Sequence, residues 1–234
     1  MGFIVKNTTK CGVFDLVCPH RCRGCGELGE LLCKCCKKDI LDAAMNHCLY
    51  CGKVIDFCCS ECKKNFLGTF VVGYRDEMIG ALVEEYKFFG VRGMERILGE
   101  VLDEFLPDFN GEIVIVPLPT IRKHVRERGV DHTYQIAKNL AKRRGWKVER
   151  LILRKKDTVQ VGAGEKLRKK QAEEAYEFFG KVDKEKTYIV FDDIWTTGAS
   201  VTEVGKILKK NGAKKLVAVV LAINRKGKKP KIIR

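Results

Sequence analysis

The sequence has no cysteine after Cys62, and all 12 of its cysteines lie between residues 11 and 62. It also lacks a long apolar run. The longest, residues 216–223, is too short to cross a bilayer and is typical of a buried parallel strand. No secretory signal is recognised, so we expect a cytoplasmic protein rather than an extracellular disulfide scaffold. These features predict a small cysteine-rich domain over residues 1–65 and an α/β domain over residues 66–234.

Most of the cysteines follow one spacing, Cys-x2-Cys-x7-Cys-x2-Cys, which occurs twice. Four thiolates in two close pairs satisfy tetrahedral Zn²⁺ and leave no open position, which is typical of a structural site. We therefore predict two structural zinc ions, and we expect metal binding to stabilise this small domain. The predicted ligands are Cys22, Cys25, Cys33 and Cys36 in the first set and Cys48, Cys51, Cys59 and Cys62 in the second.

Other uses of these cysteines fit the spacing less well than zinc does. Iron–sulfur clusters usually have other spacings, and redox chemistry by a single Cys-x2-Cys does not explain four such pairs in register. The remaining cysteines, or a nearby histidine, could each replace a neighbouring ligand, so the assignment within each set stays open. These residues are Cys11, Cys18, Cys35, Cys58, His20 and His47.

The rest of the chain alternates between strand and helix patterns. Helical spacing covers residues 73–106, with a break near Gly90, and a short strand pattern follows at residues 112–116. After a basic loop, the pattern predicts a helix at 131–144 and strands at 148–153 and 188–191. A helix at 201–211 and the strand at 216–223 complete the series. The fold class is therefore α/β, with a mostly parallel sheet and helices on both faces.

Residues 188–200, YIVFDDIWTTGAS, carry the clearest chemistry. A strand runs into two carboxylates, Asp192 and Asp193, which can accept hydrogen bonds from sugar hydroxyls or hold hydrated Mg²⁺. A loop of small and hydroxyl residues then leads into a helix, and its backbone N–H groups suit a phosphate. The alternative is an ordinary strand-to-helix turn with two solvated aspartates and a threonine cap.

This segment resembles the phosphoribosyl diphosphate (PRPP) signature of type I phosphoribosyltransferases. The resemblance implies that Asp192 and Asp193 meet the ribose hydroxyls and Mg²⁺. In purine-salvage members, an aspartate that acts on the base usually stands where this chain has Thr196, so an ordinary hypoxanthine or guanine salvage enzyme is not expected. The residues implied around the 5′-phosphate are Thr196, Thr197, Gly198, Ala199 and Ser200.

Over nearly its whole length the chain resembles the ComF (ComFC) family, in which a double zinc ribbon precedes a phosphoribosyltransferase domain. The chain departs from the family pattern at residues 130–132, and His132, at a helix start, is interpreted as a surface residue. The resemblance implies a lysine and a basic segment at the pyrophosphate, followed by a flexible loop. These residues are Lys87; Arg122, Lys123, Arg126 and Arg128; and Arg154, Thr158, Gln160 and Arg168.

The resemblance implies a role in DNA uptake during natural competence, with PRPP, Mg²⁺ and an ATP-driven DNA translocase as partners. Two hypotheses stay open: a phosphoribosyltransferase with an unidentified acceptor, and a non-catalytic accessory protein that binds single-stranded DNA and senses nucleotides. The net charge of +15 fits weak binding of single-stranded DNA. A solvated, lysine-rich surface explains that charge as well. The basic clusters lie at residues 122–128, 142–147, 154–156, 166–170 and in the tail 225–234.

The two cysteine sets lead to a prediction about metal content. Because each set is closed, the purified protein should contain about two zinc ions per chain by elemental analysis. Iron in place of zinc, or only about one zinc ion, would contradict the assignment of both sets.

Overall fold

The computed structural model describes residues 20–44, 48, 65–155 and 175–225. Five parallel strands form its central sheet, in the order β3-β9-β8-β4-β5. Strands β8 and β9 lie near its centre and are apolar along most of their length, as expected when both faces of a sheet are covered. The strands are β3 (Gly68–Tyr74), β4 (Ile113–Pro117), β5 (Lys147–Val148), β8 (Thr187–Trp195) and β9 (Lys215–Ile223).

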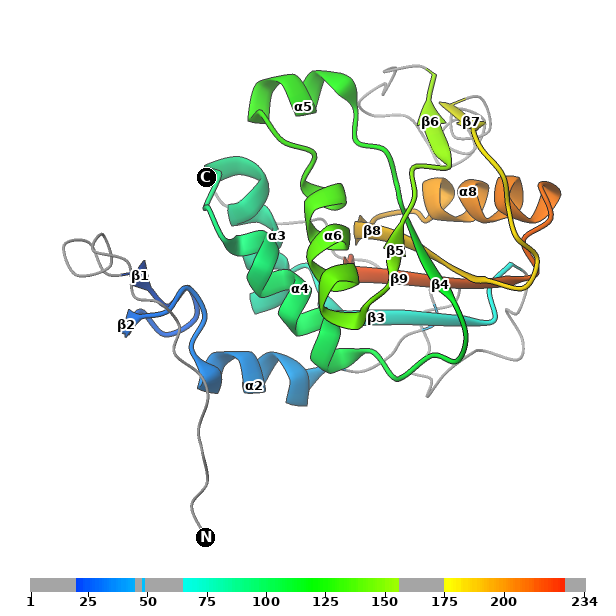
Figure 1. Ribbon diagram of the computed structural model, residues 1–234. Coiled ribbons are helices and arrows are strands. Elements are labelled where there is room, and N and C mark those ends of the chain that lie inside the picture. Colours follow the sequence, from blue (N-terminus) through cyan, green and yellow to red (C-terminus); the bar gives the residue numbers. More distant parts are fainter. Residues whose placement is uncertain (1–19, 45–47, 49–64, 156–174, 226–234) are drawn as a thin grey trace, which may run out of the picture.

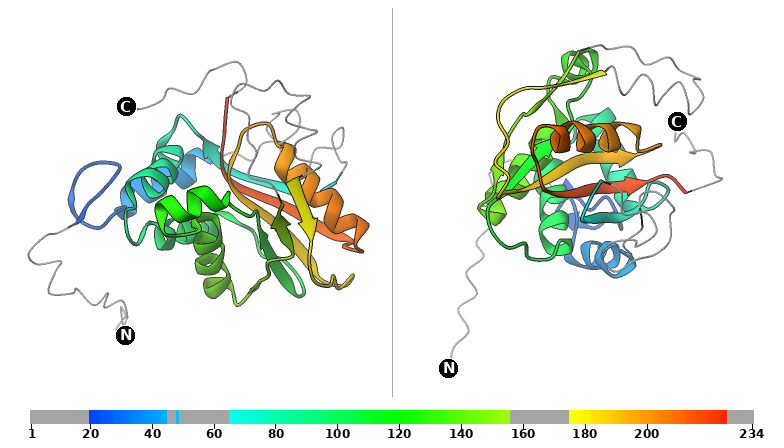
Figure 2. Two further views of the ribbon diagram at one scale, coloured as in Figure 1. Left: turned by 90° about the horizontal axis from the view of Figure 1, so that it is seen from above. Right: turned by 90° about the vertical axis from the view of Figure 1, so that its right-hand side faces the viewer.

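Helices cover both faces of the sheet (Figures 1 and 2). On one face lie α3 (Met78–Phe89), α4 (Met94–Phe105) and α6 (His132–Arg144), and on the other lies α8 (Ala199–Lys210). Alternate residues of β8 belong to the two cores: Ile189 packs with the first group and Val190 with α8. The predicted α/β sheet with helices on both faces is therefore confirmed.

Smaller elements complete the described structure. The strands β1 (His20–Arg21) and β2 (Leu28–Gly29) form an antiparallel pair that precedes α2 (Lys34–Ala43). A second antiparallel pair, β6 (Ile152–Arg154) with β7 (Tyr176–Phe178), stands apart from the central sheet. Helix α5 (Arg122–Arg128) follows the carboxyl end of β4.

The helix at residues 131–144 is confirmed, and its two ends show why the sequence predicts it. The side chain of Asp131 accepts a hydrogen bond from the Tyr134 N–H and caps the first turn. At the other end, Gly145 adopts the left-handed conformation, with φ of 68°, and terminates the helix. Within the described residues, no helix is long and apolar enough to cross a membrane.

Three elements differ from the sequence prediction. Strand β3 was not predicted, because its apolar centre is short and is flanked by Gly68 and Gly73, which are poor strand formers. Residues 122–128 form α5 rather than a loop. This helix buries no side chain, so it has no apolar periodicity to reveal it. The strand predicted at 148–153 is divided into β5 and β6, which belong to different sheets.

The first cysteine set packs directly against the α/β part of the chain. Buried Leu31, Leu32 and Ile40 belong to the same hydrophobic core as α3 and α4. Leu31 lies over Gly93, where an added Cβ would come within 3.4 Å of the leucine side chain. Thus residues 20–44 gain apolar burial from α3 and α4 as well as any stabilisation by metal.

Candidate functional site

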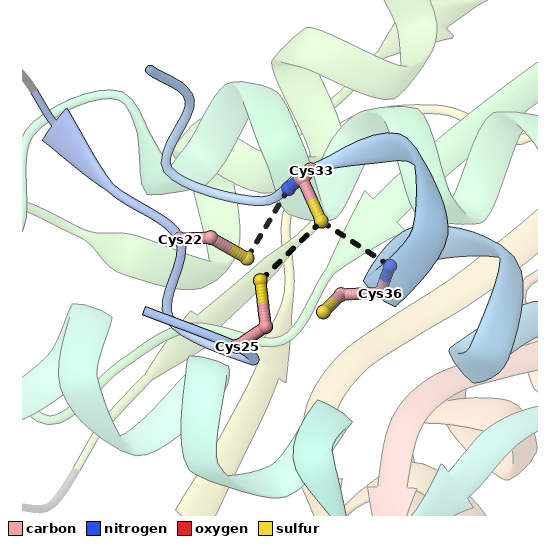
Figure 3. A group of neighbouring side chains, drawn as sticks. All are labelled: Cys22, Cys25, Cys33 and Cys36. Carbon is pink, nitrogen blue, oxygen red and sulfur yellow. Dashed lines mark hydrogen bonds between the residues drawn. The ribbon is translucent and has the colours of Figure 1, made fainter. Parts of the chain in front are cut away.

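The first four cysteine sulfurs converge on one point, with all four within 4.8 Å of one another (Figure 3). The Cys25 and Cys33 sulfurs are 3.7 Å apart. A tetrahedral zinc ion with Zn–S bonds of about 2.3 Å places its sulfurs about 3.8 Å apart, so the arrangement fits this metal. Cys22, Cys25, Cys33 and Cys36 could therefore hold one zinc ion. Of the second predicted set, only Cys48 lies within the described residues, so that set stays a prediction.

Backbone N–H groups point at the sulfur of Cys22. Those of Gly24 and Cys33 lie 3.4 and 3.3 Å from it. Burial opposes ionisation, but these N–H groups and that of Cys25 outweigh it and lower the pKa of the Cys22 thiol to about 6. A thiol that ionises this readily suits a metal ligand, because the thiolate is the species that binds zinc.

The two aspartates lie at the carboxyl end of β8, where ligands bind in open α/β sheets. Successive side chains of a strand point to opposite faces. Asp193 points toward α3 and α6, where it meets Lys87 and Thr133. Asp192 stays partly exposed, and its Oδ1 accepts a hydrogen bond from the Asp193 N–H at 2.9 Å. The adjacent acids therefore have different environments and can play different roles.

Asp193 is a buried carboxylate held by a cation. Its Oδ1 is 2.7 Å from the ammonium nitrogen of Lys87 on α3. Its Oδ2 accepts a hydrogen bond from the Thr133 hydroxyl on α6 at 3.3 Å. Burial opposes the charge of Asp193, but the neighbouring ammonium group lowers its pKa below the ordinary value. Asp193 is therefore ionised and joins β8 to two helices.

Asp192 has the opposite electrostatic character. The carboxyl group of Asp192 is only partly exposed, and this partial burial, together with repulsion by the carboxylate of Asp193, raises its pKa well above the ordinary value. A bound cation or hydroxyl donors would stabilise the ionised form of Asp192. Asp192 is thus the acid of the pair suited to hydrated Mg²⁺ or to ribose hydroxyls.

The loop after β8 turns sharply at Gly198, which has φ of 73° and forms the N-cap of α8. A Cβ at this position would lie 1.8 Å from the ring of Trp195, so both the backbone conformation and the packing require glycine. No side chain caps α8. Its first N–H groups therefore face the loop without a capping acceptor, an arrangement that suits a phosphate. The helix begins at Ala199, two residues earlier than the sequence predicts.

A cleft of about 280 Å³ brings many of the predicted residues together. Both aspartates line it, as do Thr196 from the loop and Ser200 from the first turn of α8, whereas Thr197, Gly198 and Ala199 do not. Tyr176 of β7 also lines the cleft, and its hydroxyl accepts a hydrogen bond from Arg154 at 3.3 Å. The basic residues that line the cleft are Arg75, Lys87, His124, Arg128, His132 and Arg154.

The predicted pyrophosphate and flexible-loop residues do not all line the same cavity. Lys87 and Arg128 line the cleft, whereas Arg122 and Arg126 line a neighbouring cavity. Lys123 lines neither cavity, and its ammonium group lies 3.8 Å from Glu127 on the exposed side of α5. Of the flexible-loop residues, Arg154 is described and lines both cavities. Thr158, Gln160 and Arg168 lie outside the described residues.

The sequence gives no indication that several residues line the cleft, and His132 and Phe88 are two of them. His132 is only 2% exposed and packs edge-on against Tyr86, so its interpretation as a surface residue is wrong. Its position in the helix gives no signal of this burial, which depends on packing against α3. Phe88 is 63% exposed, yet it lines the cleft with the Arg128 guanidinium 5.1 Å from its ring centroid. An apolar position at the end of a helix appears in sequence as ordinary core.

Comparisons with known proteins give partial similarities. No protein-family model matches the chain. A segment of 44 residues is 46% identical to the transcriptional regulator GfcR of Methanosphaera stadtmanae. The matched segment is 19% of this chain and 22% of that protein. The chain thus matches about a fifth of the length of this curated relative.

Two solved structures are similar in part. A hypoxanthine phosphoribosyltransferase from Staphylococcus aureus matches with a TM-score of 0.37 and 15% identity, over 59% of this chain and 65% of that one. The hypoxanthine phosphoribosyltransferase of Trypanosoma cruzi matches with a TM-score of 0.33 and 14% identity, over 66% and 69% of the two chains.

Because the two acids have different environments, replacing each of them with asparagine should change the free energy of unfolding in opposite directions. The raised pKa of Asp192 means that the folded chain keeps a proton that the unfolded chain loses, so stability falls as pH rises between the ordinary and the raised value. Without ligand at pH 8, Asp192→Asn should raise the free energy of unfolding by on the order of 1 kcal/mol. Asp193→Asn should lower it by roughly 1–3 kcal/mol, because Lys87 loses its partner. Urea titrations of both variants measure these effects, and equal losses would contradict the division of roles.

Proposed function

We propose that this chain binds PRPP with Mg²⁺ and transfers its phosphoribosyl group to a nitrogen nucleophile. The observation that supports this most strongly is the meeting of Asp192, Asp193 and the loop before α8 in one cleft with several cations. Acids at a strand end suit ribose hydroxyls and a hydrated metal, and the start of α8 suits the 5′-phosphate. The basic residues suit the pyrophosphate.

Each part of the site has a physical task in this reaction. Bound Mg²⁺ would neutralise charge on the departing pyrophosphate. Lys87 fixes Asp193, which holds the end of β8 in place and so positions the adjacent Asp192. Asp192 supplies negative charge where positive charge develops on the sugar ring. Arg128 and Arg154 attract the leaving pyrophosphate, and Tyr176 fixes the orientation of the Arg154 guanidinium.

The acceptor is not expected to be hypoxanthine, despite the names of the two similar structures. Thr196 lines the cleft at the position where purine-salvage members of the resembled family usually have an aspartate. A hydroxyl group is neutral at physiological pH and cannot accept a proton from a purine in the way that a carboxylate can.

Calorimetric titration of PRPP with Mg²⁺ tests the proposal. Asp192→Asn should weaken binding at least tenfold, because it removes the carboxylate that holds the metal and sugar. Binding to the unaltered protein should also release protons, because the metal favours the ionised form of Asp192. The measured heat should therefore depend on the ionisation enthalpy of the buffer.

Asp183→Asn is a matched control, since Asp183 is exposed and precedes the opposite end of β8. It should bind like the unaltered protein. Equal affinities in all three proteins would mean that the carboxylate of Asp192 does not take part in binding. Pyrophosphate release assays on the same proteins then separate transfer from binding alone.

We also propose a second role, weak binding of single-stranded DNA in the DNA-uptake function that the ComF resemblance implies. The exposed basic helix α5 favours this role, because it buries none of its side chains. The cluster at the end of α6 favours it less, since Arg143 and Arg144 pair with Glu100 and Asp103. A translocase that contacts the cysteine-rich domain is the protein partner proposed with this role.

Salt dependence tests DNA binding. If α5 contacts phosphates, the logarithm of the binding constant should fall with the logarithm of salt concentration, with a slope of about −0.7 per contact. Replacing Lys123 and Arg126 with Gln should flatten this slope, whereas Arg143→Gln on α6 should not. Fluorescence anisotropy with a labelled oligonucleotide measures both. Binding that is insensitive to salt, or absent at low salt, would contradict the proposal.

A further inference from the structure

Two exposed phenylalanines are neighbours at the carboxyl end of α3. Phe88 is 63% exposed and Phe89 is 77% exposed, although phenylalanine is a residue type that folding usually buries. Phe88 lines the acidic cleft, whereas Phe89 does not. Phe88 therefore offers an aromatic ring to a ligand in the cleft, and Phe89 provides a comparison at the adjacent position.

The ring of Phe88 is held in place and still open to a ligand. The Arg128 guanidinium lies 5.1 Å from its centroid, and attraction between the cation and the ring restricts the motion of both side chains. The exposed fraction leaves much of the ring uncovered. A flat aromatic ligand can stack on such a ring, whatever polar groups lie at its edge.

The same cleft holds a buried polar atom that lacks a partner. His132, the first residue of α6, lines the cleft and is 2% exposed. Within the part of the chain that the structure describes, its Nδ1 is buried and has no hydrogen-bond partner. A buried nitrogen in this state is unfavourable until a partner is supplied, and a ligand in the cleft can supply one.

His132 is suited to accept a hydrogen bond. Burial lowers the pKa of its imidazole, and the nearby positive charges of Arg128 and Lys87 add to this effect. Asp193 and the backbone of Tyr86 act in the opposite direction. The imidazole is therefore neutral, and one nitrogen of a neutral imidazole accepts a hydrogen bond. Its edge-on contact with the Tyr86 ring, at 4.3 Å between centroids, fixes its orientation.

Other groups near His132 are already engaged or can only donate. The ammonium group of Lys87 is a donor, and it is paired with Oδ1 of Asp193. The Thr133 hydroxyl donates to Oδ2 of the same carboxylate. A ligand N–H group that reaches this part of the cleft therefore has the imidazole of His132 as a suitable acceptor.

We propose that Phe88 and His132 form an acceptor subsite, and that the acceptor is an uncharged, flat heteroaromatic ring with one N–H group and a second, unprotonated ring nitrogen. The ring stacks on Phe88 and donates its N–H to His132. This proposal rests on the phosphoribosyl transfer proposed above. The unprotonated nitrogen forms a bond to the anomeric carbon as the bond from that carbon to the pyrophosphate oxygen breaks. The electron pair of the broken bond leaves with pyrophosphate, and the N–H proton then passes to solvent.

Benzimidazole and benzoxazole test the subsite, because benzoxazole has an oxygen where benzimidazole has its N–H group. In ligand-observed NMR titrations of the full chain, benzimidazole should bind about fivefold more tightly or better. His132→Phe keeps a ring and removes both nitrogens, so it should abolish this difference. Phe88→Ala removes the stacking surface alone, so it should weaken both compounds by about fivefold or more and preserve the difference. Phe89→Ala is the matched control and should change neither affinity.

Calorimetric titration of PRPP with Mg²⁺ separates this subsite from the PRPP site. PRPP should still bind to Phe88→Ala and to His132→Phe. Benzimidazole should still bind to the unaltered protein when PRPP and Mg²⁺ are saturating, or be consumed with release of pyrophosphate. Displacement of benzimidazole by PRPP, or loss of PRPP binding in Phe88→Ala, would assign Phe88 to the PRPP site and overturn the proposal.

Three further outcomes would overturn the acceptor subsite. Equal binding of benzimidazole and benzoxazole, or no binding of either, would do so while PRPP binding stands. Equal weakening by Phe88→Ala and Phe89→Ala would mean that the compounds bind to a general apolar patch. Failure of the unaltered protein to bind PRPP would remove the transfer reaction, and the acceptor role with it, even if benzimidazole binds.

Discussion

The ion pair between Lys87 and Asp193 is the interaction on which the candidate site depends. It joins the end of α3 to the end of β8, two elements far apart in sequence, and the hydroxyl of Thr133 adds α6 to the same point. Because Asp193 is neutralised by the protein, the adjacent Asp192 is left as the acid available to a ligand. The alternation of side chains along a strand thus gives two neighbouring aspartates distinct environments.

The same helix connects the site to the cysteine cluster. The first residue of α3, Met78, lies against Gly24 of the cluster, where an added Cβ would come within 3.0 Å of the methionine sulfur. Lys87 stands near the other end of α3. The cluster therefore packs against one end of the helix whose other end positions Asp193. Metal binding at the four cysteines would stabilise this packing as well as the cluster itself.

The sequence predicts the parts of the molecule whose signals are local. The strand, acids and glycine of residues 188–200 are contiguous, and the cysteine spacing is regular, so the cleft loop and the first four-cysteine cluster could be anticipated. The burial of His132 could not, because it depends on α3 packing beside α6. The sequence also could not predict that Arg122 and Arg126 line one cavity and Arg128 another. This division arises because the segment forms helix α5, which turns its successive residues toward different cavities.

A crystal structure of the full chain with PRPP and Mn²⁺ as a substitute for Mg²⁺ tests whether Asp192 and the start of α8 bind PRPP in the cleft. Anomalous scattering locates the manganese ion without reference to the protein geometry. We expect a manganese peak beside the carboxylate of Asp192, directly or through one water, and a 5′-phosphate at residues 196–200, in the loop before α8 and its first turn. A manganese ion bound elsewhere, or a PRPP molecule outside the cleft, would contradict this expectation.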